Sequence, residues 1–344
     1  MNDILAKLRG ASVTDVIGLT LVALVVLWLA INFVKAPAEF IDIGLIGLTT
    51  GLIYGIVALG YTLVYGILQL INFAHGDVFA LSGLVASTVI VSVLGLDEGA
   101  SVLAIIGGLA FTLVVIMGGF ALFNAAIERV AYKPLRSAPR LAPLITAVGM
   151  SFIVQNIGLA FYGVNYQTVP NFIPRTNVIH FGDVTYSWNK ASVVIIVIPL
   201  LVLLSWFVSS TKQGKAMRAV AQDTEASAMM GIDVNRTISV TFLLAGALAG
   251  AAGIIYLLQF NMRYDTGFEL GLIAFTAAVL GGIGNLTGAV LGALLIGFIQ
   301  AFNKGLAWFA PGSDWTRSMV FGILILVLVF RPEGLLGEQT PEGA

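Results

Sequence analysis

Residues 270–303 read LGLIAFTAAVLGGIGNLTGAVLGALLIGFIQAFN, which is 34 consecutive positions without an Asp, Glu, Lys or Arg. A helix needs about 20 apolar residues to cross the hydrocarbon core of a bilayer. The stretch is therefore too short for two full spans and a turn, and Gly281-Gly282-Ile283-Gly284-Asn285 interrupts it in the middle. We expect either two short tilted helices or a re-entrant pair, and both arrangements return the chain to the same side.

Charge-free stretches of spanning length recur along the whole chain. They separate Asp15 from Lys35, Asp42 from Asp77, Asp77 from Asp97, Glu98 from Glu128, Arg140 from Arg175, Lys190 from Lys212, and Arg236 from Arg263. The last gap, from Arg317 to Arg331, is short, so its helix must include Trp315 and Thr316 while Arg317 extends toward water. The pattern predicts an all-α polytopic membrane protein, with one transmembrane domain over 1–344 and about ten (8–10) helices, some of them interrupted or re-entrant.

The composition leads to the same class. Hydrophobic residues make up 58% of the 344 positions and charged residues 10%, against about 25% in an ordinary soluble domain. The net charge of −1 argues against a nucleic-acid-binding protein. The chain has no cysteine, and its two histidines, His75 and His180, are far apart. We therefore expect no disulfide, no metal centre and no cofactor bound by this chain.

The first apolar stretch, Val16 to Val34, follows two basic residues and precedes Ala36-Pro37-Ala38, as a signal peptide would. It is longer than the roughly 7–15 residues of a signal-peptide core, so we interpret it as an uncleaved first span. With ten crossings, eleven of the 17 basic residues fall on the side of both termini, which the positive-inside rule makes cytoplasmic. Segment 164–190 is then the main external loop. The cytoplasmic group includes Lys7, Arg9 and Arg140, and the external group includes Lys35, Arg175, Lys190, Arg263, Lys304 and Arg317.

Two interrupted apolar segments occur in the two halves of the chain. The first runs from Gln69 to Asp77 and contains Asn72 and His75, and the second is the glycine turn ending at Asn285. Transporters often place broken helices at corresponding positions of two repeats, close to the substrate path. This favours a translocation pathway lined by Asn72, His75, Gly281, Gly282, Gly284 and Asn285. In the alternative interpretation, Asn72, His75 and Asp77 form a solvated cytoplasmic turn that caps a helix starting at Val78.

The sequence contains no recognisable motif of an enzyme active site. A phosphate-binding loop of the G-x-x-x-x-G-K-[ST] type is missing, and so are G-x-S-x-G and H-E-x-x-H. The predicted spans also carry almost no ionisable residue, unlike those of many proton-coupled carriers. We therefore expect a non-enzymatic transport subunit that is powered by a partner.

The cytoplasmic segment 210–236 contains the clearest soluble helix signal. Asp223 is a good N-cap, Glu225 adds negative charge to the first turn, and Gly231 can end the helix. Ala226, Met229 and Met230 then share one face. Such a face either lies on lipid or docks into a groove of a cytosolic partner.

Three segments carry a resemblance to a known family. Glu225-Ala226-Ser227 with Gly231 resembles the EAA loop of ABC importer permeases. Gly51-Leu52-Ile53-Tyr54-Gly55-Ile56-Val57-Ala58-Leu59-Gly60, followed by Ile71-Asn72-Phe73-Ala74-His75-Gly76-Asp77, is similar to a signature of the branched-chain (hydrophobic) amino acid permeases of the Liv type. Val279 to Gly292 resembles the second, glycine-rich signature of that family. The likeness extends from about residue 43 to residue 335, and it is greater to the LivH-like subunit than to its partner permease.

This resemblance implies a permease subunit of an ABC importer in the bacterial cytoplasmic (inner) membrane. Its partners would be two ATP-binding subunits that use the ATP, a second and usually different permease subunit, and an external substrate-binding protein. The helix from Asp223 to Gly231 would couple the permease to the ATPases through Asp223, Glu225, Ala226, Met229, Met230 and Gly231. Branched-chain amino acids, other amino acids, amides and urea all stay open as substrates. A standalone secondary carrier or a polytopic membrane enzyme is the alternative function.

Overall fold

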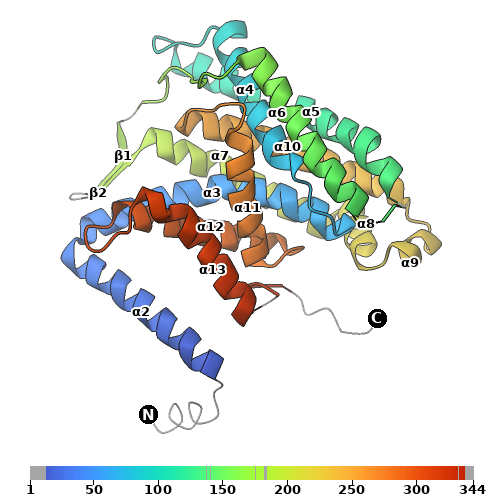
Figure 1. The fold of residues 1–344 in the computed structure, drawn as a ribbon. Coiled ribbons are helices and arrows are strands. Elements are labelled where there is room, and N and C mark those ends of the chain that lie inside the picture. Colours follow the sequence, from blue (N-terminus) through green and yellow to red (C-terminus); the bar gives the residue numbers. More distant parts are fainter. Residues whose placement is uncertain are drawn as a thin grey trace.

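The computed structural model describes residues 13–136, 138–139, 141–174, 176–181, 184–331 and 333–337 (Figure 1). Its helices are α2 (Val13–Lys35), α3 (Pro37–Leu68), α4 (Ala74–Thr88), α5 (Val102–Ile127), α6 (Leu141–Tyr162), α7 (Trp188–Ser210), α8 (Lys212–Gln222), α9 (Thr224–Met229), α10 (Val234–Gln259), α11 (Thr266–Gly281), α12 (Leu286–Gly305) and α13 (Thr316–Phe330). Short π or 3-10 turns extend three of them, at Val89–Val93, Glu128–Tyr132, Lys133–Leu135 and Ser313–Trp315.

The predicted membrane spans are confirmed. Nine helices of the described residues are long and apolar enough to cross a membrane, and α11, with 16 residues, is a shorter tenth. The opening stretch 270–303 forms the pair α11 and α12, joined at the predicted glycine turn. Two helices fit because α11 begins upstream of Glu269 and α12 continues past Lys304. The final helix also begins as predicted, with Trp315 in a 3-10 turn and Thr316 as its first residue.

The helices place the connecting segments at two ends of the bundle. At the first end lie the start of α3, the end of α10 and the turn between α12 and α13. At the second end lie the end of α3, the segment α8–α9 and the turn between α11 and α12. The basic residues Lys7, Arg9, Arg140 and Arg175, which the orientation prediction counts, are outside the described residues.

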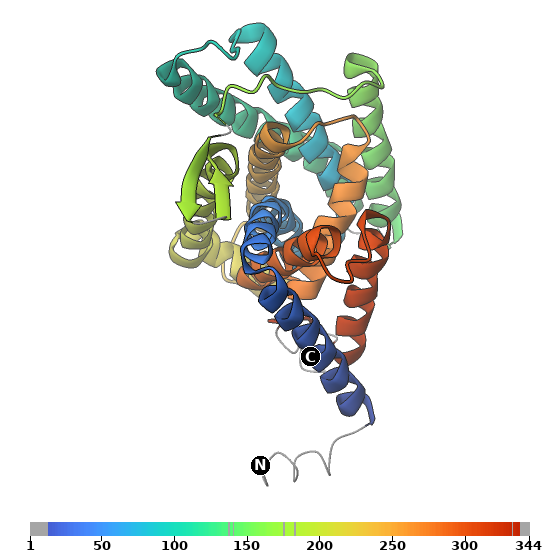
Figure 2. The ribbon, with the colours of Figure 1, turned by 90° about the vertical axis from the view of Figure 1, so that its left-hand side faces the viewer.

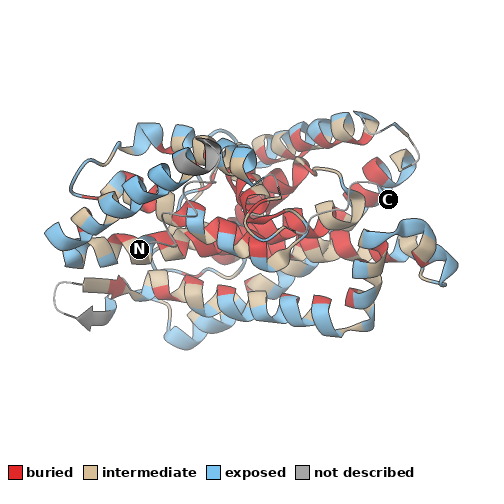
Figure 3. Ribbon diagram, turned by 90° about the horizontal axis from the view of Figure 1, so that it is seen from below, coloured by how far each residue is buried: buried red, intermediate tan, exposed pale blue. Residues whose placement is uncertain are grey.

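The core is built around α3 and α10. In each of these helices 72% of the most apolar window is buried, whereas only 6% is buried in α2. Figure 3 shows the same contrast, with buried residues in the centre and exposed residues along the outer helices. In Figure 2, α2 runs away from the other helices toward the N-terminus. Near its C-terminal end, Trp28 Nε1 donates to the Trp308 carbonyl and Asn32 Oδ1 accepts from Trp308 N. Near its start, Gly18 lies beside the Phe330 ring of α13.

Glycines four residues apart, Gly51 and Gly55 in α3 and Gly246 and Gly250 in α10, have the spacing that lets helices approach closely. A Cβ atom on Gly51 would lie 2.8 Å from Leu294 Cα of α12, and one on Gly250 would lie 3.0 Å from the Ile116 carbonyl oxygen of α5. Gly55 differs, because a Cβ there would make an ordinary contact of 3.8 Å with Ala293 Cβ. In α3 the close approach therefore requires glycine at position 51 but not at position 55.

Three features of the fold were not predicted. Within segment 164–190, which is predicted as a loop, an antiparallel hairpin of β1 (Asn177–Phe181) and β2 (Val184–Ser187) forms the one sheet of the described residues. It is held to α3 by a hydrogen bond of 2.8 Å between Tyr186 OH and Thr49 Oγ1. The loop then ends earlier than expected, because α7 begins at Trp188. Helix α8 is the third feature.

Candidate functional site

A large cavity opens at the first end, between α3, α10, α11, α12 and the turn before α13. We call it the vestibule. Its volume is about 840 Å³, within the roughly 300–1,000 Å³ of typical small-molecule pockets. Its lining combines aromatic, aliphatic and charged side chains and comprises Ile46, Thr50, Tyr54, Tyr166, Tyr256, Phe260, Asn261, Arg263, Asp265, Thr266, Glu269, Leu270, Ile273, Gln300, Ala301, Lys304, Ser313, Asp314, Thr316 and Arg317.

The deepest polar contact of the vestibule joins α3 to α12. Tyr54 OH donates to Gln300 Oε1 at 2.9 Å, and both side chains are buried. Ile273 of α11 is buried beside them in the lining. Beyond Tyr54, α3 is buried continuously as far as Val64. Tyr54 is thus the point at which the lining of the vestibule passes into the buried core of α3.

Six charged residues line the vestibule, and four of them form ion pairs. Arg263 donates from Nε to Asp265 Oδ1 at 2.6 Å within the turn that follows α10. Arg317 of α13 donates from Nε to Glu269 Oε1 of α11 at 2.8 Å. The Asp265 carboxylate raises the pKa of Arg263, which lies outside the helices. The remaining two are Lys304 and Asp314.

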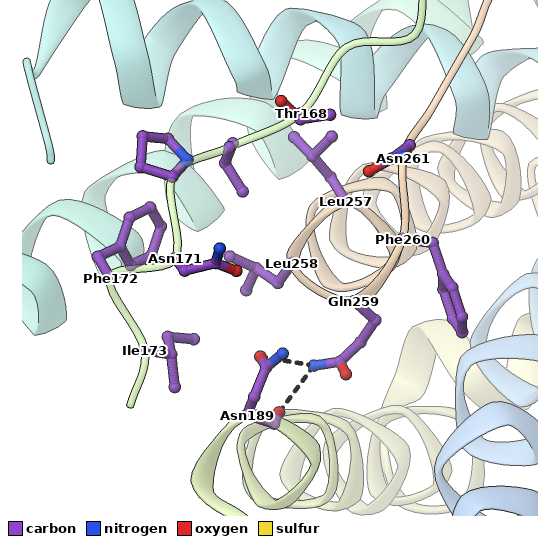
Figure 4. Close-up of a pocket in the computed structure, with 12 residues that line it drawn as sticks. Thr168, Asn171, Phe172, Ile173, Asn189, Leu257, Leu258, Gln259, Phe260 and Asn261 are labelled. Atoms are coloured by element: carbon purple, nitrogen blue, oxygen red, sulfur yellow. Dashed lines mark hydrogen bonds between the residues drawn. The ribbon is translucent and has the colours of Figure 1, made fainter. Parts of the chain in front are cut away.

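A second, smaller cavity adjoins the vestibule. It has a volume of about 430 Å³, lies between α6, α11 and α13, and shares Asp265, Glu269, Ile273 and Arg317 with the vestibule. A third cavity, of about 80 Å³, lies between segment 168–173, Asn189 and the end of α10 (Figure 4). There Gln259 Nε2 donates to the Asn189 carbonyl oxygen at 2.7 Å. The third cavity has room for a few water molecules but not for an amino acid.

The first interrupted segment is more deeply buried than a solvated turn would be. The break between α3 and α4 covers 69–73, and α4 already begins at Ala74, so the expected helix start at Val78 was wrong. Asn72, His75 and Asp77 are 3%, 0% and 1% exposed. The interpretation of these residues as a solvated cytoplasmic cap was therefore wrong as well. The error arose because polar side chains next to a span boundary look the same in sequence whether water or protein surrounds them.

Each of these buried residues contacts a neighbouring helix or turn. Tyr132 OH donates to Asn72 Oδ1 at 2.7 Å, and the His75 ring packs edge-on against Tyr61 with centroids 4.8 Å apart. Ser151 Oγ of α6 donates to the Asp77 carboxylate. Asn72 and His75 line none of the cavities described above.

The glycine turn lies at the second end and is covered by the C-terminal segment. Gly282 and Gly284 have φ values of 105° and 93°, which favour glycine. Asn285 Oδ1 accepts from Gly288 N at 2.9 Å and caps α12, and its Nδ2 donates to the Leu336 carbonyl at 2.8 Å. Gly281 O accepts from Leu336 N at 3.0 Å.

The structure does bring the two interrupted segments together. A Cβ atom on Gly66, near the end of α3, would lie 3.6 Å from Gly284 Cα. Tyr65, Ile71 and Ile283 line one small gap of about 10 Å³. Of the six residues predicted for a pathway, the four of the glycine turn lie at the second end, where Gly284 is exposed. Asn72 is buried next to Ile71, whereas His75 lies deeper in the bundle, packed against Gly60 and Tyr61. That the six residues line the pathway stays a prediction.

The short helix α9 has the predicted caps. Asp223 Oδ1 accepts from Ala226 N at 2.8 Å, and Gly231 follows the helix with a φ of 84°. The side chains of Met229 and Met230 are 82% and 83% exposed. In Figure 1, α9 lies at the edge of the molecule. The expected apolar face is thus present and without a covering element among the described residues.

Helix α8 anchors α9 to the bundle. Thr211 Oγ1 accepts from Gly214 N at 3.0 Å and caps the helix, while Met217 and Val220 are buried. Arg218 donates to the Val208 carbonyl oxygen near the end of α7. The spacing of Met217 and Val220 was an available signal for this helix, since both fall on one face.

We expect Ser151→Ala to lower the free energy of unfolding by about 1.5–3 kcal/mol, because the buried Asp77 carboxylate loses a hydrogen-bond donor. Thermal unfolding of the detergent-purified protein measures the effect. Ser192→Ala is the matched control, because Ser192 Oγ donates to Asn189 O one turn earlier in its own helix. Equal unfolding temperatures for the two variants would contradict a stabilising role for the contact between α4 and α6.

Comparison with known proteins identifies relatives over most of this architecture. Residues 44–329 match the family described as "Branched-chain amino acid transport system / permease component". The permease BraD of a high-affinity branched-chain amino acid transport system from Pseudomonas aeruginosa is 38% identical over 304 residues, covering 86% of this chain and 95% of BraD. The corresponding LivH of Escherichia coli is 35% identical with the same coverage. A fructose import permease, FrcC of Rhizobium meliloti, is 26% identical over 55% of this chain and 54% of its own length.

Proposed function

The chain belongs to the family of branched-chain amino acid transport system permease components, and from this membership we propose that it is the permease subunit of an ABC importer for branched-chain or related amino acids. The observation that carries the proposal is the family match from residue 44 to 329, which includes most of α3 and nearly all of α13, and so covers both the vestibule and α9. The first span, α2, lies outside this match. A fructose import permease is also similar to this chain, so the similarity extends to permeases with a different named substrate. The substrate must therefore be inferred from the binding site and not from the fold.

The two features lie at opposite ends of the bundle, as a transport subunit requires. Helix α10 begins next to α9 and ends at the vestibule, and its 26 residues span about 39 Å at 1.5 Å per residue. We assign the vestibule to the external side and α9 to the cytoplasmic side of the bacterial cytoplasmic membrane, with both termini cytoplasmic. The positive-inside rule supports this orientation.

In the proposed mechanism, an external binding protein delivers the amino acid to the vestibule. One of the two partner ATPases contacts α9 through its exposed methionines, and closure of the two ATPases on ATP shifts the equilibrium between outward and inward access. A second permease subunit completes the transporter. Because the sequence has no phosphate-binding loop, the chain itself is proposed to have no ATPase activity.

Reconstitution tests the proposal against its alternatives. The chain is placed in proteoliposomes alone, or with the second permease and both ATPases, and leucine uptake is followed with and without ATP and the binding protein. We expect uptake only with the complete set and ATP. Uptake by the chain alone in an ion gradient would identify a standalone carrier, and turnover of a lipid would identify a membrane enzyme. Binding of leucine, amides and urea to the external protein decides the substrate.

A further inference from the structure

Two opposite charges in the vestibule have no partner charge among the described residues. Lys304 stands in the last turn of α12, and Asp314 stands in the 3-10 turn before α13. Neither takes part in an ion pair within the described part of the chain. Asp314 Oδ1 accepts a long hydrogen bond of 3.4 Å from the adjacent Ser313. Both side chains are exposed in a cavity that has room for a small molecule.

A buried asparagine joins the two backbone segments that carry these charges. Asn303 Nδ2 donates to the Gly312 carbonyl oxygen at 2.7 Å and to Thr316 Oγ1 at 2.9 Å. The Asn303 side chain is fully buried. The backbone that carries Lys304 is therefore tied to the turn that carries Asp314, so both side chains extend from one hydrogen-bonded corner of the vestibule.

The vestibule as a whole carries no net charge. Three basic and three acidic side chains line it, and the four outside the Lys304 and Asp314 pair neutralise each other in ion pairs. Such a cavity gives no net attraction to a cation or an anion. It does offer one free positive and one free negative group beside apolar side chains such as Ile46, Leu270 and Ile273.

We propose that Lys304 and Asp314 form a binding site for the zwitterionic head of an apolar α-amino acid, with Lys304 on the carboxylate and Asp314 on the ammonium group. This inference rests on the proposed function and makes the permease itself selective. The amino-acid side chain then contacts the apolar lining. Because both charges are exposed to water, the site is weak, which suits a substrate that is received from a binding protein and passed on.

Ligand binding to the complete transporter in nanodiscs, without the binding protein, tests the site. The probes are L-leucine, leucinamide, which lacks the carboxylate, and 4-methylpentanoate, which lacks the ammonium group, and saturation-transfer NMR measures their affinities. We expect Lys304→Met to weaken leucine binding about tenfold without changing that of leucinamide. Asp314→Asn should weaken leucine binding by a similar factor without changing that of 4-methylpentanoate.

Matched controls are available in segments that we place on the same side of the membrane. Lys190→Met and Asp97→Asn remove one positive and one negative charge from residues that do not line the vestibule, and both should leave leucine binding unchanged. The proposal is overturned if Lys304→Met weakens leucinamide as much as leucine, or if neither vestibule variant changes leucine affinity.

Two further measurements distinguish the amino-acid site from a docking site for the binding protein and from the proposed transport function. If the variants weaken docking of the binding protein and leave leucine affinity intact, the charges serve a protein contact and the amino-acid site is refuted. Leucine uptake by the wild-type transporter tests the proposed function independently. Uptake without leucine binding in the vestibule would refute the site alone, whereas absence of uptake would refute the function.

Discussion

Replacing Met229 and Met230 together by Asp is expected to reduce ATP-dependent uptake by the assembled transporter about a hundredfold. The two side chains are more than four-fifths exposed on α9 and form its apolar face. If this face docks into the ATPase, each aspartate must be buried without a partner, and a hundredfold loss corresponds to about 2.7 kcal/mol, within the cost of such burial. Uptake into proteoliposomes and co-purification of the ATPase measure the effect.

The control for this variant is the pair Met229→Leu and Met230→Leu, which keeps an apolar face of similar volume and should retain most of the uptake. A second variant tests the same helix through its ends. Glu225→Lys with Gly231→Pro reverses the charge in the first turn and places proline, which requires a negative φ, at a position with a φ of 84°. Both variants should still insert into the membrane. Intact uptake in either of them would refute the coupling role of α9.

Gly281→Ala is expected to destabilise the fold by about 1–3 kcal/mol, through overpacking between α11 and α12. A Cβ atom at this position would collide with the Gly288 carbonyl oxygen, and it would also lie 2.7 Å from Ala289 N. These are backbone atoms, so no side chain can rotate away to make room. Thermal unfolding of the purified protein, together with the yield of folded protein from membranes, measures the loss.

Gly322→Ala is the matched control, because a Cβ atom on this α13 glycine would meet no heavy atom within 4 Å. It should leave stability unchanged or raise it slightly, since alanine has the higher helix propensity. The explanation by overpacking fails if the two substitutions have the same effect. If the Gly281→Ala protein folds, its remaining uptake activity shows whether the glycine turn also lies on the substrate path.

The membrane helices could be predicted because charged residues and glycines influence where a helix ends through nearby residues of the chain alone. A charged residue inside a span is costly, so gaps between charges marked α5 and α10 closely, and the glycine turn at 281–285 marked the end of α11. The caps of α9 were predictable for the same reason, because Asp223 bonds a backbone group only three residues away.

The buried polar groups and the vestibule could not be predicted in this way. Asp77 is buried because Ser151, 74 residues later in the chain, supplies a hydrogen bond, and no local pattern records that contact. Arg263, Lys304 and Arg317 were recognised only as charges at span boundaries. Their meeting around one cavity depends on how α10, α12 and α13 pack, which a charge count along the chain does not contain.

The contact between α3 and α12 has a mechanical consequence. At Gly47 and Gly51 the two helices meet with backbone against backbone, and a Cβ atom on Gly47 would lie 3.0 Å from Phe298 Cα. Because neither glycine has a side chain to separate the two backbones, this part of the contact has little that can repack to let one helix slide past the other. We therefore expect α3 and α12 to move as one rigid body. Spin labels placed on the two helices at this contact should keep their separation through the whole ATP cycle, while labels on the outer helices change theirs.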